Sequence, residues 1–299
     1  MSGLARVLIV GAAGQVGVEL QRSFAGCGEI IAVDRESVDL ADADQTRALV
    51  RRVEPDLILN AAAYTAVDRA ESEPELALAI NAQAPRVLAE EALSRNALLV
   101  HYSTDYVFDG AKSGRWTEED KPAPLNTYGA TKLAGEEAIR QVGGQYLIFR
   151  TSWVYGPHGA NFLLTMLRLA RQRDRISVVD DQIGGPTTSI VLGRATREIV
   201  SGALAGKFGA TEDWAGLYHM TCSGSTSWSG FAQAIFDRAG NLLDGKAPVV
   251  VPITSEEYPT PAPRPRNSIL SNARLAARFG VRLAPWETAL DATIHDISS

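Results

Sequence analysis

Two residues in the stretch YGATK, Tyr128 and Lys132, stand four positions apart. On a helix, residues at this spacing lie one above the other on the same face, so a phenol and an ammonium would be neighbours. A phenol in water has a pKa of about 10 and transfers protons poorly near neutrality, but a nearby ammonium favours its ionised form. The pair predicts a proton-transferring tyrosine tuned by a lysine. The alternative is an ordinary solvated turn of helix.

A third polar residue, Thr104, lies in YSTDYVFDG, 24 positions before Tyr128. Reduction of a ketone needs a hydride at carbon and a proton at the developing alkoxide. Our hypothesis makes Tyr128 the general acid and Lys132 both its tuner and a ligand of the nicotinamide ribose. Thr104 would donate a hydrogen bond to the same carbonyl oxygen, where charge develops.

The elements that must position these residues alternate along the first half of the chain. Short apolar runs, rich in β-branched residues, predict buried parallel strands at residues 6–10, 29–33, 56–60, 98–103 and 146–150. Stretches with helical spacing lie between them, at 43–53, 75–93 and 129–142. This alternation predicts an α/β fold with a doubly wound parallel (Rossmann) sheet that binds its ligand at the carboxyl ends of the strands.

A glycine-rich stretch, GAAGQVG, follows the first predicted strand. Its glycines, Gly11, Gly14 and Gly17, allow a tight turn, a close approach to a pyrophosphate and tight packing of helix on strand. The next helix then begins facing the anion. These features predict a dinucleotide site.

The second strand ends at Asp34 and Arg35, which favour different cofactors. An acidic side chain there accepts hydrogen bonds from the adenosine ribose, whereas a guanidinium pairs with a 2′-phosphate. NADH and NADPH therefore both remain open. Asp39, Leu40 and the turn from Ala61 to Thr65 are expected beside the adenine and the middle of the cofactor; a helix cap is the alternative for Asp39.

The second half of the chain is less regular, with the Gly- and Pro-rich stretches GPHGAN, DDQIGGPTTS and YPTPAPRPRNS. We expect residues 1–152 to form the dinucleotide-binding domain. Residues 153–299 should form mainly a smaller C-terminal substrate-binding domain, with segments that return to the main sheet.

Composition narrows the class of protein. The chain has 299 residues, 45% hydrophobic content and a formal charge of −6, which disfavours a general nucleic-acid or membrane-surface binder. Without a long apolar run or a signal-peptide pattern, a cytoplasmic location is expected. Two isolated cysteines, Cys27 and Cys222, and four scattered histidines indicate neither a disulfide framework nor a zinc site.

Taken together, the motifs resemble those of the dTDP-4-dehydrorhamnose reductases, which belong to the extended short-chain dehydrogenases. The resemblance rests on GAAGQVG, NAAAYTAVDRAESEPELALAINA, VHYSTDYVFDG, PLNTYGATKLAGE, LIFRTSWVYG and YPTPAPRPRNS. It implies reduction of dTDP-4-dehydro-L-rhamnose to dTDP-L-rhamnose with NADPH or NADH, the last step in making a sugar donor for bacterial surface polysaccharides.

The resemblance also implies roles for individual positions. Thr104, Tyr128 and Lys132 match the family's catalytic set, and Asp105 and Trp153 match its sugar contacts. The expected cofactor contacts are Gly11, Gly14, Gln15, Val16, Gly17, Asp34, Arg35, Asp39, Leu40, Ala62, Ala63, Tyr64, Thr65, Tyr102, Tyr128 and Lys132.

Family members dimerise in some cases through magnesium held by carboxylates, so a homodimer is one expectation. Glu19 fits such a magnesium ligand, but the aligned position in GGPTTSIVL is Ile190, which cannot coordinate a cation. A metal is therefore not favoured. The substrate diphosphate needs cations, for which Arg264 and Arg266 are the candidates. Trp153 is expected to close over the sugar ring, with core packing as its alternative.

Other functions remain in competition. Nucleotide-sugar 4,6-dehydratases carry an Asp-Glu pair after the threonine, but here Thr104 and Asp105 are followed by Tyr106. Epimerisation coupled to reduction would need a further acid/base pair, and no Cys/His pairing indicates one. A non-catalytic NADP-binding regulatory subunit and a reductase of another nucleotide keto-sugar stay open.

Overall fold

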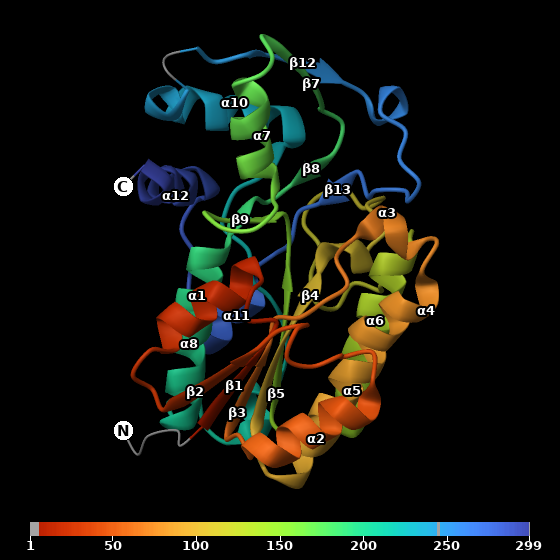
Figure 1. The fold of residues 1–299 in the computed structure, drawn as a ribbon, viewed down its shortest axis with the longest axis vertical. Coiled ribbons are helices and arrows are strands. Elements are labelled where there is room, and N and C mark those ends of the chain that lie inside the picture. The colour runs from red at the N-terminus through yellow and green to blue at the C-terminus, as the bar shows by residue number, and fades with distance from the viewer. Residues whose placement is uncertain (1–5, 244–245, 299) are drawn as a thin grey trace.

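The structure is a computed structural model that describes residues 6–243 and 246–298. Its centre is a parallel sheet of six strands in the order β10-β5-β4-β3-β1-β2 (Figure 1). The strands are β1 (Arg6–Val10), β2 (Glu29–Val33), β3 (Leu57–Asn60), β4 (Leu98–Thr104), β5 (Tyr146–Thr151) and β10 (Gly216–His219). The predicted doubly wound parallel sheet is confirmed.

The strand order reverses at β1, which pairs with β2 on one side and with β3 on the other. In open parallel sheets, ligands bind in the crevice outside the carboxyl ends of the strands at such a reversal. The glycine-rich turn follows β1 at this crevice, and Thr104 is the last residue of β4. The fold therefore brings the predicted cofactor and proton-transfer residues to one edge of the sheet.

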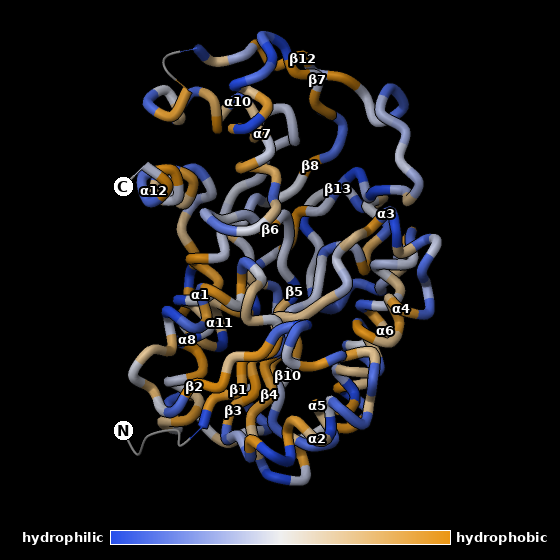
Figure 2. The backbone as a smooth tube through the Cα atoms, viewed as in Figure 1, coloured by the Kyte–Doolittle hydropathy of each residue, from blue (hydrophilic) through white to orange (hydrophobic). Residues whose placement is uncertain are grey.

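Helices cover both faces of the sheet. One face carries α1 (Gln15–Phe24), α8 (Ser189–Leu204) and α11 (Ala273–Phe279), whose apolar side chains share one core with alternate residues of the strands. The other face carries α2 (Ala43–Val53), α5 (Ala84–Ser94) and α6 (Thr127–Val142). Figure 2 shows the strands β1, β3 and β4 as a block of hydrophobic residues between these layers.

The predicted helix at 75–93 is interrupted. The chain forms α3 (Val67–Ala70) and α4 (Pro74–Leu78), then a π-helical turn, η1 (Ala79–Gln83), before α5 begins. The wider turn presents Asn81, which is fully buried, to the chain after β3. An apolar helical pattern does not reveal such a turn, because each flanking segment keeps its own helical spacing.

A smaller unit lies above the carboxyl edge of the sheet (Figure 1). It has its own apolar core, built by α7 (Phe162–Ala170), α10 (Trp228–Arg238) and α12 (Trp286–Ser298) with β7 (Arg175–Val179). The remaining short elements are η2 (Asp105–Val107), β6 (Val154–Tyr155), β8 (Ile183–Gly184), β9 (Thr187–Thr188), α9 (Thr211–Trp214), β11 (Thr226–Ser227), η3 (Gly240–Leu242), β12 (Val249–Ile253), η4 (Ser255–Glu257) and β13 (Asn267–Ser268).

The chain crosses between the two units several times. Helix α8, strand β10 and helix α11 all follow residue 152 in sequence, yet they pack with the main sheet. The expected division at residue 152 therefore describes only the first five strands. Within the described residues, no helix is both long and apolar enough to cross a membrane.

Candidate active site

Helix α6 carries Tyr128 and Lys132 on its first two turns. Asn126 caps its N-terminus by accepting a hydrogen bond from the Gly129 N–H at 2.8 Å, and this satisfies one of the donors that a helix start leaves free. A Cβ at Gly129 would lie 2.2 Å from the Tyr106 carbonyl oxygen, and one at Gly135 2.1 Å from that of Asn81. Both glycines let the helix approach the neighbouring backbone, which brings Tyr128 close to the end of β4.

Thr104 and Asp105 lie at that end of β4 and are buried. The Thr104 hydroxyl donates to Asp105 Oδ1 at 3.1 Å and accepts the Tyr106 N–H at 3.2 Å. Burial raises the pKa of Asp105 to about 6, although the nearby hydroxyls of Ser268 and Thr104 lower it. The Tyr106 ring packs edge-on against Tyr128, with ring centroids 5.6 Å apart.

The Tyr128 phenol lies near the Thr104 side chain. Burial raises the pKa of Tyr128 to about 12, the hydrogen bond with Thr104 lowers it, and the Asp105 charge raises it. The protonated phenol is therefore strongly favoured at neutral pH. In this form it is a proton donor, which is the state that a general acid requires.

Lys132 is buried, with 1% of its surface exposed. Its ammonium nitrogen, Nζ, lies 2.6 Å from the Tyr102 carbonyl oxygen and 3.3 Å from His101 Nε2. Burial lowers the pKa of Lys132 to about 8, against the attraction of Glu136. Lys132 is not among the groups that shift the pKa of Tyr128 here. The tuning of Tyr128 by Lys132 thus stays a prediction.

A second cation, Arg150 of β5, is buried beside the next turn of α6. Arg150 on β5 forms two short hydrogen bonds with the Glu136 carboxylate, at 2.8 Å and 2.6 Å. Their side chains are only 3% and 1% exposed. Ser103 donates a further hydrogen bond to Glu136 at 2.5 Å. This pair fixes α6 against β4 and β5.

The glycine-rich turn has the geometry of a dinucleotide cradle. Gly11 has φ of +83°, and a Cβ there would lie 2.6 Å from the Ala62 nitrogen. A Cβ at Gly17 would lie 2.1 Å from the Gly11 carbonyl oxygen. Helix α1 begins directly after Gly14. Its first N–H groups thus face the crevice where a pyrophosphate would bind, so these residues fit the dinucleotide.

Two acidic residues expected beside the cofactor both stabilise turns. Asp34 Oδ1 accepts hydrogen bonds from the Glu36 N–H and the Ser37 hydroxyl. Asp39 accepts the Ala41 N–H at 2.9 Å. The cap of α2 is Asp42, not Asp39, because its side chain accepts the N–H groups of Asp44 and Gln45. The helix-cap alternative for Asp39 is therefore wrong.

A buried amide that sequence reasoning missed links this region to α6. Asn81 accepts the Tyr64 N–H at 2.8 Å and donates to the Tyr64 carbonyl at 3.1 Å and to Thr131 Oγ1 at 3.1 Å. Asn81 thereby holds the turn after β3 against the helix that carries Tyr128. Its only signal in the sequence is a polar residue within the apolar run LALAINAQAP.

The other residues expected to contact the cofactor lie in different parts of the fold. Gln15 accepts a hydrogen bond from Asn161 Nδ2 at 3.0 Å, which links the glycine turn to α7. Tyr64 donates to Glu73 at 2.5 Å.

The side chain of Tyr102 points away from α6: its hydroxyl lies 2.6 Å from Thr196 Oγ1, and its ring packs in the core beneath α8. The prediction that the Tyr102 side chain contacts the cofactor is therefore wrong, because strand alternation turns its ring to the face of the sheet opposite α6. Among the other expected contacts, Val16 lies at the start of α1, Arg35 and Leu40 lie between β2 and α2, and Ala62, Ala63 and Thr65 follow β3.

The expected sugar contacts face the smaller unit. Trp153 has φ of +48°, which is rare for a bulky residue, and it stacks on Trp228 with ring centroids 3.5 Å apart. Buried polar atoms of Asp105, Thr151 and Ser152 have no hydrogen-bond partner among the described residues. Unsatisfied polar atoms beside a half-buried indole suit a polyhydroxylated ring.

The two arginines of the Pro-rich loop differ in their environment. Arg264 forms a bidentate ion pair with Asp68 on α3, at 2.8 Å and 2.9 Å. Arg266 is 69% exposed and lies 3.8 Å from Glu256. Arg264 thus holds the loop to α3, whereas Arg266 keeps its guanidinium available for an anion. The phosphate role stays a prediction for both.

Nothing in the described residues favours a metal. Glu19 is buried and pairs with Arg22 at 2.9 Å, and Ile190 is buried and apolar. Among the residues that the structure describes, no group of three acidic, histidine or cysteine side chains is placed to hold a cation. The donor set does not fit magnesium, so we assign no chemical step to a metal.

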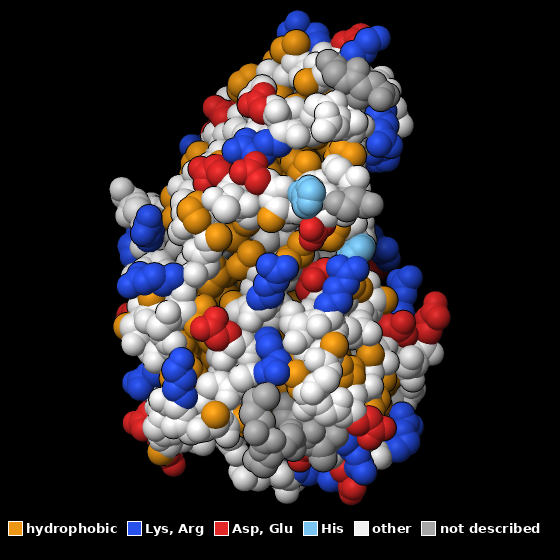
Figure 3. Space-filling view, turned by 90° about the vertical axis from the view of Figure 1, so that its left-hand side faces the viewer, with side chains coloured by type: hydrophobic (Ala, Val, Ile, Leu, Met, Phe, Trp, Pro, Cys, Tyr) orange, Lys and Arg blue, Asp and Glu red, His pale blue; other side chains and the backbone are white. Residues whose placement is uncertain are grey.

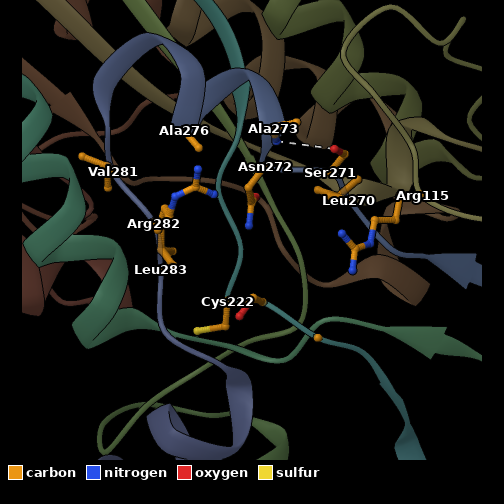
Figure 4. Close-up of a pocket in the computed structure, with 12 residues that line it drawn as sticks. Arg115, Cys222, Leu270, Ser271, Asn272, Ala273, Ala276, Val281, Arg282 and Leu283 are labelled. Carbon is orange, nitrogen blue, oxygen red and sulfur yellow. Dashed lines mark hydrogen bonds between the residues drawn. The ribbon is translucent and has the colours of Figure 1, made fainter.

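A hollow of about 350 Å³ lies away from these residues, beside α11 and the chain after β10 (Figure 4). Arg115, Arg282 and Cys222 line it, and none of the predicted site residues does. On the face of the molecule in Figure 3, basic and acidic side chains are interspersed, without a field of one sign.

The parallel sheet and the glycine cradle, with Thr104 and Tyr128 at the carboxyl end of β4, indicate the class of protein: a nicotinamide-dinucleotide-dependent oxidoreductase of the short-chain type. A family model described as the RmlD substrate binding domain matches residues 5–299. A dTDP-4-dehydrorhamnose reductase of Burkholderia thailandensis is 44% identical, covering 98% of this chain and 99% of the relative. One from Escherichia coli K12 is 43% identical, with 97% of each covered. The chain belongs to this family.

Comparison with solved structures supports this family assignment. A dTDP-4-dehydrorhamnose reductase of Bacillus anthracis, in complex with NADP, superposes with a TM-score of 0.88 at 37% identity, covering 98% of this chain and 99% of that one. An orthologue from Clostridium acetobutylicum gives 0.90 at 37% identity, covering 98% of this chain and all of that one. A Thermus thermophilus UDP-glucose 4-epimerase with NAD, 20% identical over 98% of this chain and 99% of that one, gives 0.76 and shows the shared fold alone.

Proposed function

We propose that this chain reduces the C4 ketone of dTDP-4-dehydro-L-rhamnose to dTDP-L-rhamnose with NADPH or NADH, as the last step of dTDP-L-rhamnose synthesis. The relatives that carry this name span nearly the whole chain. The observation that supports the chemistry is the Tyr128 phenol, which burial keeps protonated and which lies near Thr104 at the carboxyl end of β4.

A bound nicotinamide cofactor would supply the hydride to C4, and the chain would supply the proton. Tyr128 gives its phenolic proton to the developing alkoxide, which becomes the C4 hydroxyl. The Thr104 hydroxyl, which donates to Asp105 in this structure, would turn to donate a hydrogen bond to the same oxygen and stabilise its negative charge. Lys132, in its charged form, would stabilise the phenolate that remains after proton transfer, and it would hold the nicotinamide ribose.

Residues outside this set would hold the remainder of the substrate. Trp153 and the unsatisfied polar groups of Asp105 and Ser152 would contact the sugar. Arg266 would pair with the diphosphate at the exposed end of the Pro-rich loop. We assign sugar-nucleotide binding mainly to the smaller unit. A homodimer and a cytoplasmic location remain predictions, which light scattering and cell fractionation would check.

The competing dehydratase chemistry lacks its base here. Tyr106 follows Asp105, and its ring packs against Tyr128, so no second carboxylate follows the threonine. A non-catalytic regulatory subunit would not need a protonated phenol beside a threonine hydroxyl at the cofactor crevice.

The test is nicotinamide oxidation by the purified protein, with dTDP-4-dehydro-L-rhamnose generated in the same tube. NADPH and NADH are compared, and the product is analysed by mass spectrometry and NMR. Oxidation that yields dTDP-L-rhamnose supports the proposal and ranks the cofactors. Measurable cofactor binding with no oxidation would contradict it; other nucleotide keto-sugars and co-purifying enzymes would then be examined.

A further inference from the structure

A fully buried histidine lies behind Lys132. His101 is on β4, where strand alternation turns its side chain toward α6. Its two ring nitrogens each meet one polar neighbour: Nδ1 lies 3.0 Å from Asn60 Nδ2, and Nε2 lies 3.3 Å from Lys132 Nζ. His101 has no role in the reaction described so far.

The neighbour on the Nδ1 side fixes the position of the ring proton. The Ala62 N–H can only donate, and it lies 3.2 Å from Asn60 Oδ1, so this oxygen accepts. The other amide atom of Asn60 is then the NH₂ group, which can only donate. His101 Nδ1 must therefore accept, and a neutral imidazole with Nδ1 unprotonated carries its proton on Nε2.

This proton points at Lys132. A neutral amine has a lone pair that accepts the Nε2–H, and it can still donate to the Tyr102 carbonyl at 2.6 Å. An ammonium has three donors and no lone pair, so it would set a donor against a donor at this position. The contact accommodates the amine and disfavours the ammonium.

We propose that His101 is a positioning residue that holds Lys132 in its neutral form beside β4, so that protonation of Lys132 releases its side chain toward Tyr128. The lysine then has two positions, selected by its proton. The effect on turnover rests on the function proposed above. The tautomer of His101 and the two positions of Lys132 are independent of that function.

The charged and titratable groups around Lys132 come from several elements. On α6, Glu136 attracts the ammonium but is already paired with Arg150 of β5, and Tyr128 is protonated at neutral pH. In η2, directly after β4, Asp105 lies beside Tyr128. From β3 and η1, the polar neighbours are the uncharged amides Asn60 and Asn81. Burial and then the Lys132 charge lower the pKa of His101 well below its ordinary value, which agrees with a neutral ring.

Nitrogen NMR of the protein labelled with ¹⁵N-histidine tests the tautomer without substrate. The His101 signals are assigned by their loss in His101→Gln. We expect a neutral ring with the proton on Nε2, whose shift changes as the pH passes about 8, with no such change in Lys132→Met. A proton on Nδ1, a charged imidazole, or a titration unaffected by Lys132→Met would overturn the proposal.

A second experiment reads the consequence for turnover. In His101→Gln the side-chain oxygen can accept from the ammonium, so the alkaline limb of kcat/KM should move up by about one pH unit. His219→Gln is the matched control, since His219 is equally buried on β10 and lies outside the site. A His101→Gln limb that stays in place, or moves no more than the control, would overturn the proposal. If neither protein turns over substrate, the NMR result still decides the tautomer.

Discussion

Two successive turns of helix α6 each hold a buried cation against the sheet, but they hold it in different ways. Near the middle of the helix, Arg150 has a carboxylate partner, Glu136, in a bidentate pair. Near the start, Lys132 has only a carbonyl oxygen and an imidazole nitrogen. A fully paired cation cannot easily change its charge or position, whereas one with neutral partners can do both. We infer that the first pair serves the fold and that the second serves the chemistry.

The largest stability effect is expected where the cation is fully paired. Glu136→Gln leaves the Arg150 guanidinium buried without a counter-charge, which should lower the free energy of unfolding by about 3–5 kcal/mol. Urea denaturation measures it, with Glu137→Gln at the adjacent exposed position as the control. A loss no greater than that of the control would contradict the structural role of this pair.

At the turn of α6 that carries Lys132, pH should affect the stability of the fold. Its pKa falls from 10.5 to about 8 on folding, so between these values the unfolded chain binds more protons than the folded one. The free energy of unfolding should therefore rise with pH across this window, by an amount on the order of 3 kcal/mol relative to Lys132→Met. Urea denaturation at several pH values measures the difference. Parallel curves for the two proteins would show that Lys132 keeps its ordinary pKa.

The hydroxyl beside Tyr128 should matter less than the phenol itself. Thr104→Val removes one donor to the alkoxide, and the turnover number should fall about a hundredfold. Thr104→Ser, which keeps the hydroxyl, should recover most of it. If valine and serine behave alike, Thr104 acts through packing and not through its hydrogen bond.

The smallest effect is expected at the Pro-rich loop, where a similar contrast separates the two arginines. Arg266→Gln should raise KM for the nucleotide sugar about tenfold, the value of one charge-assisted hydrogen bond. Arg264→Gln should raise KM no more than Asp68→Asn does, because Arg264 acts through that ion pair. A larger KM for Arg264→Gln than for Asp68→Asn would make Arg264 a direct phosphate ligand.

Much of the fold follows from local patterns in the sequence. Buried parallel strands carry continuous apolar runs, and the five predicted strands begin and end within one residue of β1 to β5; β10, the sixth strand of the sheet, was not predicted. The glycine cradle is also predictable, because Gly11 and Gly17 are required by close backbone approaches that any side chain would block. The end of β4 could be read in the same way, since Thr104 closes the apolar run.

The parts that escape prediction depend on contacts between distant segments. Asn81 gains its role from a π-helical turn and from partners 17 and 50 positions away. Arg264 forms an ion pair with Asp68, which lies 196 positions earlier in the chain. Which face of β4 meets α6 decides that His101, and not the Tyr102 ring, contacts Lys132. No local pattern carries this information.

The central claim is that Tyr128 gives the proton that completes ketone reduction. The direct measurement is the single-turnover rate of nicotinamide oxidation, with cofactor bound and nucleotide sugar in excess, for the natural protein and Tyr128→Phe. We predict a rate lower by roughly a thousandfold, as expected for loss of a general acid, with cofactor affinity nearly unchanged. A Tyr128→Phe rate within about tenfold of the natural protein would contradict the account, because proton transfer would then come from another group.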